Sequence, residues 1–288
     1  MGEQHSATAT GLSGGMASII NFAQYPLDDL NSDTGRALVE RCRDEVRRTG
    51  ACLLPDFITP EARDAWLSEA GRVEGKAHQV DHDFTYGAAG EKAAEPPASL
   101  PEDDPRNYLS HTAMKFVAKD LIGDGCSIKD LHRWEPMAAF IRQVMERPAY
   151  PSGCPLSGLV FTIAYDGEEQ DWHFDNNDFI VTLMLQKPAE GGHFEYMPGL
   201  RTPEGEDDFE TIKAVHKGTC PDVIRPPIRP GTLTLFKGRY NYHRASPVIG
   251  NHPRVMAIFA YEREPDSRQS DAASSMLFFG RTQEQALA

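Results

Sequence analysis

Residues 171–185 read DWHFDNNDFIVTLML, a short polar segment that runs directly into an apolar strand. In an extended segment, side chains at positions i and i+2 point to the same face. His173 and Asp175 are therefore expected to project together, while Phe174 points away. An imidazole nitrogen and a carboxylate oxygen on one face make half of a metal site. A third ligand has to come from another part of the chain.

Several further strands are expected in the second half of the chain. Short runs rich in Val, Ile, Thr, Phe and Tyr are separated there by turn signals such as Gly191-Gly192 and Pro230-Gly231. Evenly spaced short strands predict an antiparallel sandwich or jelly roll with a ligand cavity between its sheets. The expected strands are Leu159 to Tyr165, Phe179 to Leu185, His193 to Met197, Thr232 to Phe236 and Arg254 to Tyr261.

The first half of the chain is predicted to be mostly helical. Residues 32–49 carry a helical apolar stripe, with Ser32 or Asp33 as the cap and Gly50 at the end. A short strand follows at Ala51 to Leu54, and Thr59-Pro60 begins a second helix. Further helices are expected at Met114 to Ile122, Pro136 to Glu146 and, as an insert in the second half, Glu206 to Lys217.

No linker divides the two halves, so we expect an α+β protein with helices packed outside one β core. Residues 19–265 form the expected single domain, with a helical part at 19–150 and a jelly-roll core at 151–265. A flexible tail at 1–18 precedes it, and a C-terminal extension at 266–288 follows. The stretch from Ala77 to Pro105 has no sustained period and is our candidate lid.

The composition excludes several classes of protein. The 288 residues carry 29 Lys and Arg against 43 Asp and Glu, a net charge of −14, which disfavours nucleic-acid partners. No apolar run is long enough for a membrane span. Five scattered cysteines without a C-x-x-C pair, and no secretory signal, indicate a reducing cytoplasm without a disulfide framework.

Two downstream residues complete the candidate site. His243, after the strand expected at Thr232 to Phe236, can supply the third ligand. Two imidazoles and one carboxylate hold Fe(II) by one face and leave positions open for a co-substrate and O₂. Arg254 lies eleven residues after His243 and opens the next strand. If these strands are antiparallel neighbours, its guanidinium can bind the far carboxylate of a dicarboxylate such as 2-oxoglutarate.

The region from Ser157 to Pro265 resembles the iron(II)/2-oxoglutarate-dependent oxygenases, which have a cupin-like double-stranded β-helix fold. More narrowly, the chain is similar to the small standalone amino-acid hydroxylases and radical halogenases of bacterial natural-product pathways. The resemblance implies Fe(II) at His173, Asp175 and His243, a 2-oxoglutarate anchor at Arg254, and O₂ as oxidant. It is carried by residues 51–57 (ACLLPDF), 172–175 (WHFD), 181–186 (VTLMLQ), 190–196 (EGGHFEY) and 243–248 (HRASPV).

One position separates the two chemistries within that group. The halogenases carry Gly or Ala in place of the carboxylate, which lets a halide take the vacated position on iron. Here the residue is Asp175. The resemblance therefore implies hydroxylation of an unactivated C–H bond in a free amino acid or a small amino-acid-like metabolite, with succinate and CO₂ as coproducts. Desaturation and ring formation stay open.

Other polar and aromatic residues near the motif are candidates for binding. Tyr165 either hydrogen-bonds 2-oxoglutarate, as aromatic hydroxyls do in related oxygenases, or packs in the core. Core packing would also explain Trp172, and turn chemistry would explain the two asparagines. Arg244 is expected to form a structural ion pair. The candidate substrate-binding residues are Trp172, Asn176, Asn177, Glu195, Arg239 and Asn241.

Two other functions fit the same residues. A cupin-like metalloenzyme that uses no 2-oxoglutarate would share the metal ligands but would not need Arg254. A non-catalytic, metabolite-binding jelly roll would carry the His and Asp residues incidentally. In each case the partner is a small molecule, and the sequence leaves the oligomeric state open, a homodimer included.

Overall fold

The first helices begin and end where the sequence predicts. The computed structural model describes residues 15–85, 100–268 and 272–288. Helix α2 (Asp33–Thr49) starts after Ser32, whose hydroxyl accepts a hydrogen bond from the backbone of Gly35 at 3.1 Å. It ends at Gly50, which has the left-handed conformation (φ 79°) that glycine adopts without strain. Helix α3 (Pro60–Val73) is capped in the same way by Thr59.

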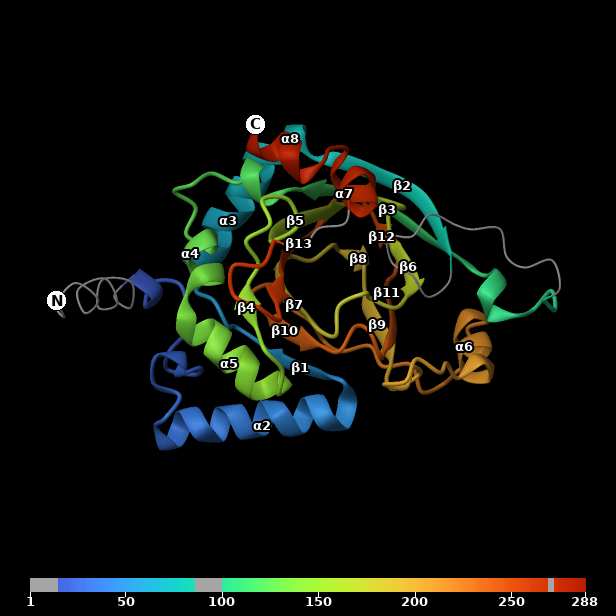
Figure 1. Cartoon of the computed structure of the whole chain (residues 1–288), viewed down its shortest axis with the longest axis horizontal. Coiled ribbons are helices and arrows are strands. Elements are labelled where there is room, and N and C mark those ends of the chain that lie inside the picture. The colour runs from blue at the N-terminus through green and yellow to red at the C-terminus, as the bar shows by residue number, and fades with distance from the viewer. Residues whose placement is uncertain (1–14, 86–99, 269–271) are drawn as a thin grey trace.

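A single ten-stranded antiparallel sheet curls round to form the core (Figure 1). The strand order is β1-β10-β7-β13-β5-β3-β6-β11-β9, with β2 paired to β3. This confirms the predicted α+β jelly-roll core with helices outside. The strands are β1 (Ala51–Leu54), β2 (His78–Thr85), β3 (Leu109–Val117), β5 (Leu159–Ala164), β6 (Gln170–His173), β7 (Ile180–Gln186), β9 (Phe194–Met197), β10 (Leu233–Phe236), β11 (Tyr242–Ala245) and β13 (Arg254–Phe259).

The remaining elements are short or lie outside the sheet. Two small ladders pair β4 (Tyr150–Pro151) with β14 (Tyr261–Glu262) and β8 (Glu190–Gly191) with β12 (Val248–Ile249). Helices α4 (Ile128–Arg133) and α5 (Glu135–Met145) lie with α2 and α3 on one side of the sheet (Figure 1). Short 3-10 helices lie at Leu27–Asp29, Glu74–Lys76, Pro105–Asn107 and Lys119–Leu121.

The two faces of the sheet have different surroundings because successive side chains alternate between them. On the outer face, Leu183 lies opposite both Leu233 and Ala257 and packs with the apolar residues of the helices. On the inner face, Thr182 and Thr234 line a cavity instead. The main hydrophobic core therefore lies between sheet and helices, and the inside of the curl is left for a site.

The structure corrects the secondary structure predicted for two segments within residues 77–122. Of the helix predicted at Met114 to Ile122, only Lys119–Leu121 is helical, as a short 3-10 helix, while residues 114–117 are the end of β3, which pairs with β2 on one side and β5 on the other. A short apolar run fits either period, and here the sheet neighbours decide. Residues 78–85 of the candidate lid form β2, whose only fully buried described side chains are Val80 and Phe84. With so few apolar residues, the sequence of this strand does not show a strand pattern. Residues 86–99 of the candidate lid lie outside the described residues.

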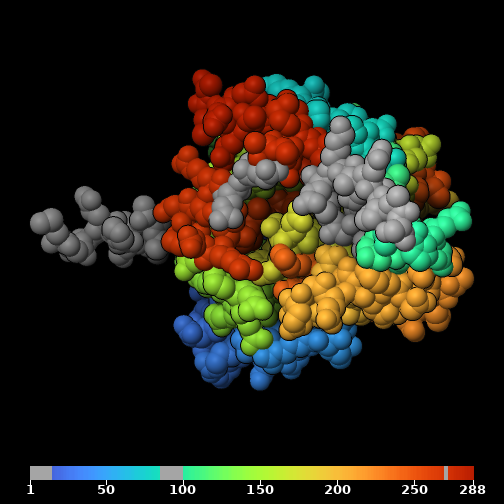
Figure 2. All heavy atoms as spheres, turned by 45° about the vertical axis from the view of Figure 1, so that its right-hand side comes forward, coloured from blue at the N-terminus to red at the C-terminus, as the bar shows by residue number. Residues whose placement is uncertain are grey.

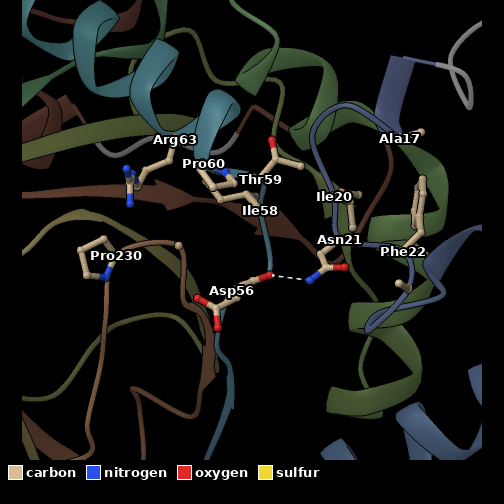
Figure 3. A pocket seen from close by; sticks show the side chains of 12 residues that line it. Ala17, Ile20, Asn21, Phe22, Asp56, Ile58, Thr59, Pro60, Arg63 and Pro230 are labelled. Atoms are coloured by element: carbon tan, nitrogen blue, oxygen red, sulfur yellow. Dashed lines mark hydrogen bonds between the residues drawn. The ribbon is translucent and has the colours of Figure 1, made fainter.

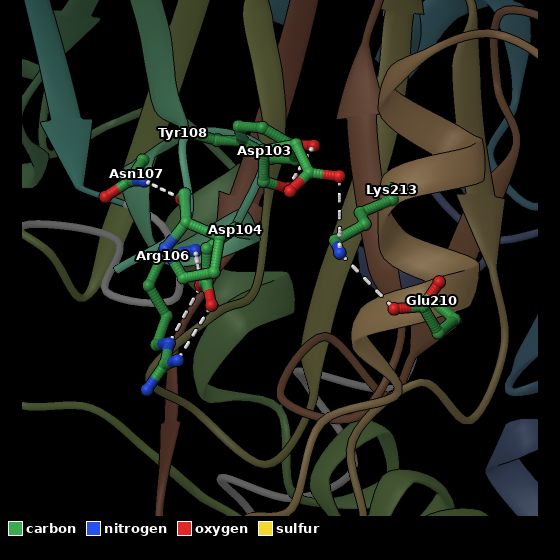
Figure 4. Close-up of polar contacts among 8 residues, drawn as sticks. Asp103, Asp104, Arg106, Asn107, Tyr108, Glu210 and Lys213 are labelled. Carbon is green, nitrogen blue, oxygen red and sulfur yellow. Dashed lines mark hydrogen bonds and ion pairs between the residues drawn. The ribbon is translucent and has the colours of Figure 1, made fainter. Parts of the chain in front are cut away.

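The last part of the predicted lid is fixed against helix α6 (Phe209–His216), the insert expected at Glu206 to Lys217. The Lys213 ammonium lies 3.5 Å from Asp103 and 3.3 Å from Glu210 (Figure 4). The side chain of Asp104 accepts hydrogen bonds from Arg106 at 2.8 Å. Residues 103–107 therefore have defined partners.

Both ends of the described chain contact the core. Residues 1–14 of the expected tail lie outside the described residues, and Met16 is already buried. In the expected C-terminal extension, helix α7 (Ala272–Phe279) packs on β2 and is followed by α8 (Gln283–Leu287). The ring centroid of Phe278 on α7 lies 5.1 Å from that of Phe116 on β3.

Among the helices of the described residues, none has the length and apolar composition that crossing a bilayer requires.

We expect a buried histidine to make the fold sensitive to acid. His132 on α4 is fully buried, its Nε2 donates a hydrogen bond to the Ala260 carbonyl at 2.8 Å, and burial lowers its pKa to about 4. Between pH 6.5 and pH 4 the unfolded chain takes up a proton that the folded chain resists. The free energy of unfolding should therefore decrease as the pH is lowered through this window, by about 3 kcal/mol from this group.

Urea unfolding of wild type and His132→Gln between pH 7.5 and 4.5 checks this expectation. The variant should show a shallower pH dependence. His252→Gln, at an exposed position, controls for the loss of a histidine as such. An equal change of slope in both variants would contradict the assignment.

Candidate metal centre

Two imidazoles and one carboxylate converge at the inner face of the sheet. His173 at the end of β6 pairs across the ladder with His243 on β11, and their ring centroids are 4.1 Å apart. The chain turns after β6, which brings the Asp175 carboxylate between them. Its Oδ1 lies 3.6 Å from His173 Nε2, and its Oδ2 lies 3.4 Å from His243 Nε2. These three side chains could hold a metal ion.

Backbone carbonyls orient both imidazoles. His173 Nδ1 lies 2.7 Å from the Asp171 carbonyl, and His243 Nδ1 lies 2.9 Å from the Asn241 carbonyl. A proton on each Nδ1 satisfies these carbonyls, so each Nε2 presents its lone pair to the shared centre. This is the outer hydrogen bonding that metal-binding histidines commonly make.

Two buried polar atoms at this centre have no hydrogen-bond partner within the described residues, His173 Nε2 and Asp175 Oδ2. Buried polar atoms are rarely left unpaired, because each costs free energy. A divalent cation would satisfy both. Two nitrogens and one carboxylate oxygen are also the donor set of non-haem Fe(II) sites, so the residues present fit that metal.

The charge states at neutral pH suit a cation. Burial raises the pKa of Asp175, but the two imidazoles outweigh burial and hold it below its ordinary range. Burial, helped by the neighbouring His173, lowers the pKa of His243 to about 4. An ionised carboxylate and a neutral imidazole are the forms that bind a metal ion.

A glycine that the sequence analysis missed makes room for the carboxylate. The backbone N–H of Asp175 donates to the Gly238 carbonyl at 3.1 Å. A Cβ on Gly238 would lie 1.7 Å from Asp175 Oδ2, so no larger residue fits there without displacing that oxygen. Gly238 lies between β10 and His243, a position that the sequence shows. Its contact with Asp175 could not be predicted from the sequence.

The three side chains open into a cavity of about 110 Å³ inside the curled sheet. Arg254 lies in its wall at the start of β13, is 8% exposed, and donates from Nε to the Gly192 carbonyl at 3.1 Å. Burial lowers the pKa of this guanidinium to about 10, so it stays charged at neutral pH. No carboxylate among the described residues pairs with it. Sequence analysis missed other inward-facing residues of the wall, namely Phe116, Thr162, Gln170, Thr182 and Thr234.

Tyr165 does not reach this cavity. Its hydroxyl donates to Glu74 at 2.8 Å, and Lys115 lies over its ring at 4.9 Å. Burial and the Glu74 carboxylate raise the pKa of Tyr165 to about 12. The expectation that it hydrogen-bonds 2-oxoglutarate is not met, because the residue ends its strand facing a 3-10 helix and not the inside of the curl.

Three of the expected substrate-binding residues have structural roles instead. Trp172 stacks on Tyr242 at 5.4 Å, because it points to the face opposite that of His173. Glu195 pairs with Arg244 at 2.7 Å and also with Arg225, which confirms the ion pair expected for Arg244. The Asn241 side chain links the Gly50 carbonyl and the Gly199 backbone N–H at 3.2 and 2.9 Å.

The other three candidates border a second cavity, which we call the outer cavity. It measures about 410 Å³ and is lined by Asn176 and Asn177, directly after Asp175, and by Arg239. In Figure 2 a hollow opens between the C-terminal segment, in red, and the yellow and green segments. Its wall holds charges of both signs, from Arg147, Asp178, Glu262, Arg263 and Glu264.

A separate cavity of about 510 Å³ lies between residues 17–23 and the start of α3 (Figure 3). Asn21 and Asp56 meet there, with Asn21 Nδ2 at 3.5 Å from the Asp56 carbonyl. None of the described residues that line it is a histidine or a cysteine. Among the described residues, the one group of His, Cys, Asp and Glu side chains that could hold a metal ion is His173, Asp175 and His243, and it lies outside this cavity.

Comparisons with known proteins agree with this geometry. The model of a family described as Halogenase D matches residues 105–277, a span that contains all three converging side chains and Arg254. No curated protein matches the chain in sequence.

Solved structures share the fold at low sequence identity. AviO1 from Streptomyces viridochromogenes Tue57 has a TM-score of 0.53 and 18% identity, over 81% of this chain and 97% of its own. HygX from Streptomyces hygroscopicus, solved with nickel, 2-oxoglutarate and hygromycin B, has 0.51 and 14%, over 77% and 86%. The non-heme alpha-ketoglutarate-dependent epimerase SnoN from nogalamycin biosynthesis has 0.50 and 17%, over 77% and 81%.

Replacing Gly238 with alanine is expected to weaken metal binding by about tenfold or more, because the new methyl group displaces the Asp175 carboxylate. Anaerobic calorimetric titration with Co(II) or Fe(II) measures this affinity, and far-UV circular dichroism checks the fold. Gly125→Ala, where a Cβ meets no atom within 4 Å, is the matched control. Equal affinity in Gly238→Ala and wild type would contradict the role given to this glycine.

Proposed function

The chain belongs to the Halogenase D family, and on this basis we propose that it is an Fe(II)- and 2-oxoglutarate-dependent dioxygenase. Its proposed reaction is hydroxylation of an unactivated C–H bond in a free amino acid or a small amino-acid-like metabolite. The observation that carries the proposal is the convergence of His173, Asp175 and His243 in one cavity with the buried Arg254.

In this proposal each of the four residues has one task. His173, Asp175 and His243 hold Fe(II) by one face, which leaves three positions of an octahedron for other ligands. Bound Fe(II), with 2-oxoglutarate and O₂, would supply oxidation of the C–H bond while succinate and CO₂ are released. Arg254 holds the far carboxylate of 2-oxoglutarate.

The surroundings of Arg254 support this task. A buried guanidinium without an acidic partner is costly unless a ligand brings the negative charge. The described residues place no carboxylate against Arg254, while Met256 and Ile258 of the same strand line the same cavity. The likeness to HygX, which was solved with 2-oxoglutarate, supports the choice of co-substrate. A cupin-like enzyme without a co-substrate would have no use for this cation.

Asp175 favours hydroxylation although the family is described as Halogenase D. In the halogenases that the sequence resembles, Gly or Ala leaves a position free for halide. Here the carboxylate meets both imidazoles, and the backbone at Gly238 is shaped around its Oδ2. The carboxylate therefore belongs to the proposed metal shell, and halide has no vacated position to take.

The cavities support a small polar substrate. The inner cavity is small, and the outer cavity beside Asp175 presents both cations and anions. Opposite charges a few residues apart suit a zwitterion, whose ammonium and carboxylate each find a partner. Arg147, Glu262 and Glu264 make no ion pair with another described residue, so they are the best candidates for this recognition.

Arg254→Gln is expected to weaken 2-oxoglutarate binding by about 100-fold, through loss of a buried charge-assisted pair. Metal affinity should change little, because the three metal-binding side chains are untouched. Anaerobic titrations of metal, and then of 2-oxoglutarate, into wild type and variant separate the two effects. An equal loss of both affinities would contradict the task given to Arg254.

A screen of free amino acids tests the reaction itself. We expect one substrate to gain a single oxygen atom while an equal amount of succinate forms. Asp175→Gly in chloride should lose most of this hydroxylation by vacating a metal position. Chlorinated product from the protein with Asp175 intact would refute the hydroxylase assignment. Absence of any 2-oxoglutarate turnover would favour a co-substrate-free metalloenzyme or a binding protein.

A further inference from the structure

A fourth cavity, which we call the cationic pocket, lies beside the segment that precedes His243. It measures about 600 Å³ and lies between the ends of α2 and α5 and the chain around residues 237–241. Arg48, Arg147 and Lys237 line it, together with apolar side chains and the carboxylates of Glu146 and Asp178. Arg147 also borders the outer cavity, so the two cavities adjoin.

Cations outnumber carboxylates in this pocket, and its two carboxylates are already paired, Glu146 with Arg47 and Asp178 with Arg263. Two of its cations already have partners, since Arg47 pairs with Glu146 at 2.6 Å and Arg201 with Asp207 at 2.7 Å. No side chain among residues 15–85, 100–268 and 272–288 forms a hydrogen bond or an ion pair with Arg48, Arg147 or Lys237. These three cations lack an acidic partner although the protein as a whole carries a net charge of −14.

The backbone fixes Lys237 in this place. Its N–H donates to the Gly50 carbonyl at 2.9 Å, at the junction of α2 and β1. Burial, and then the positive charge of Arg147, lower the pKa of the Lys237 ammonium, and the Glu146 carboxylate opposes them only in part. A half-buried ammonium beside an arginine is unfavourable unless an anion joins them.

The pocket also has the size and the walls of a small-molecule site. Its volume lies in the usual range for ligand cavities, and Met145, Phe179 and Tyr240 give it an apolar side. Three cations exceed what one carboxylate needs, whereas a phosphate group brings nearly two negative charges and three acceptor oxygens. We propose that the cationic pocket binds a phosphate-bearing small molecule through Arg48, Arg147 and Lys237.

A ligand in this pocket would touch the segment that shapes the metal centre. Lys237 directly precedes Gly238, which packs on Asp175, and the Asn241 carbonyl accepts the hydrogen bond from His243. The phosphate could belong to a substrate that extends from the outer cavity or to a separate effector. Binding itself does not depend on the proposed reaction and can be measured without metal.

Calorimetric titration of metal-free protein with phenyl phosphate tests the proposal, with benzoate as a singly charged comparison. We expect phenyl phosphate to bind about tenfold or more tightly than benzoate. Lys237→Gln and Arg147→Gln should each weaken phenyl phosphate binding by a similar factor. Lys217→Gln, at an exposed site, and Arg254→Gln, in the inner cavity, should bind as wild type does.

Three results would overturn the proposal: no binding of phenyl phosphate by wild type, binding by Lys237→Gln and Arg147→Gln that is as tight as by wild type, or a loss of binding only in Arg254→Gln. Activity measurements on the iron-loaded enzyme show whether the phosphate group belongs to the substrate or to a separate effector. Competition between phenyl phosphate and the amino-acid substrate identifies an extended substrate. A changed rate of succinate formation without competition identifies an effector. Because the titration uses metal-free protein, its failure is distinct from failure of the oxygenase assignment.

Discussion

The pairing of β6 with β11 is the contact on which the site depends. It sets His173 opposite His243 with both imidazoles turned inward. Side chains alternate along a strand, so a shift of one residue in either strand would turn one imidazole to the outer face. The position of Asp175 follows from the same register, because the turn after β6 returns the carboxylate toward both rings against the backbone of Gly238.

The rest of the fold supports buried polar groups that the described residues leave without a hydrogen-bond partner or, for the guanidinium of Arg254, without an acidic one. His173 Nε2, Asp175 Oδ2 and the Arg254 guanidinium are all buried on the inner face. The outer face of β1, β5, β7, β10 and β13 is apolar, and its packing against α2, α3, α4 and α5 stabilises the sheet independently of the site. This difference between the two faces allows a charged cavity on one side of the sheet and an apolar core on the other. Cationic side chains without an acidic partner, in the inner cavity and in the cationic pocket, indicate that each cavity binds an anionic ligand.

Local signals in the sequence predicted much of this structure, and long-range contacts account for the errors. Caps at Ser32 and Thr59 located two helices, and runs of β-branched and aromatic residues between turn signals located β7, β10 and β13. The converging side chains were predicted from their spacing and strand context. β3 was mistaken for a helix because its pairing with β5 is not visible locally. Some predicted site residues instead contact residues that are distant in sequence or lie on the other face, namely Tyr165, Trp172, Glu195 and Asn241. The close approach of Gly238 to Asp175 depends on how the turn folds.

A crystal structure of the protein prepared anaerobically with Fe(II) and 2-oxoglutarate tests the central claim most directly. The account predicts one iron within about 2.2 Å of His173 Nε2, of His243 Nε2 and of a carboxylate oxygen of Asp175. It also predicts the far carboxylate of 2-oxoglutarate against the Arg254 guanidinium. Iron bound by other residues, or 2-oxoglutarate bound with Arg254 turned away from it, would contradict the account.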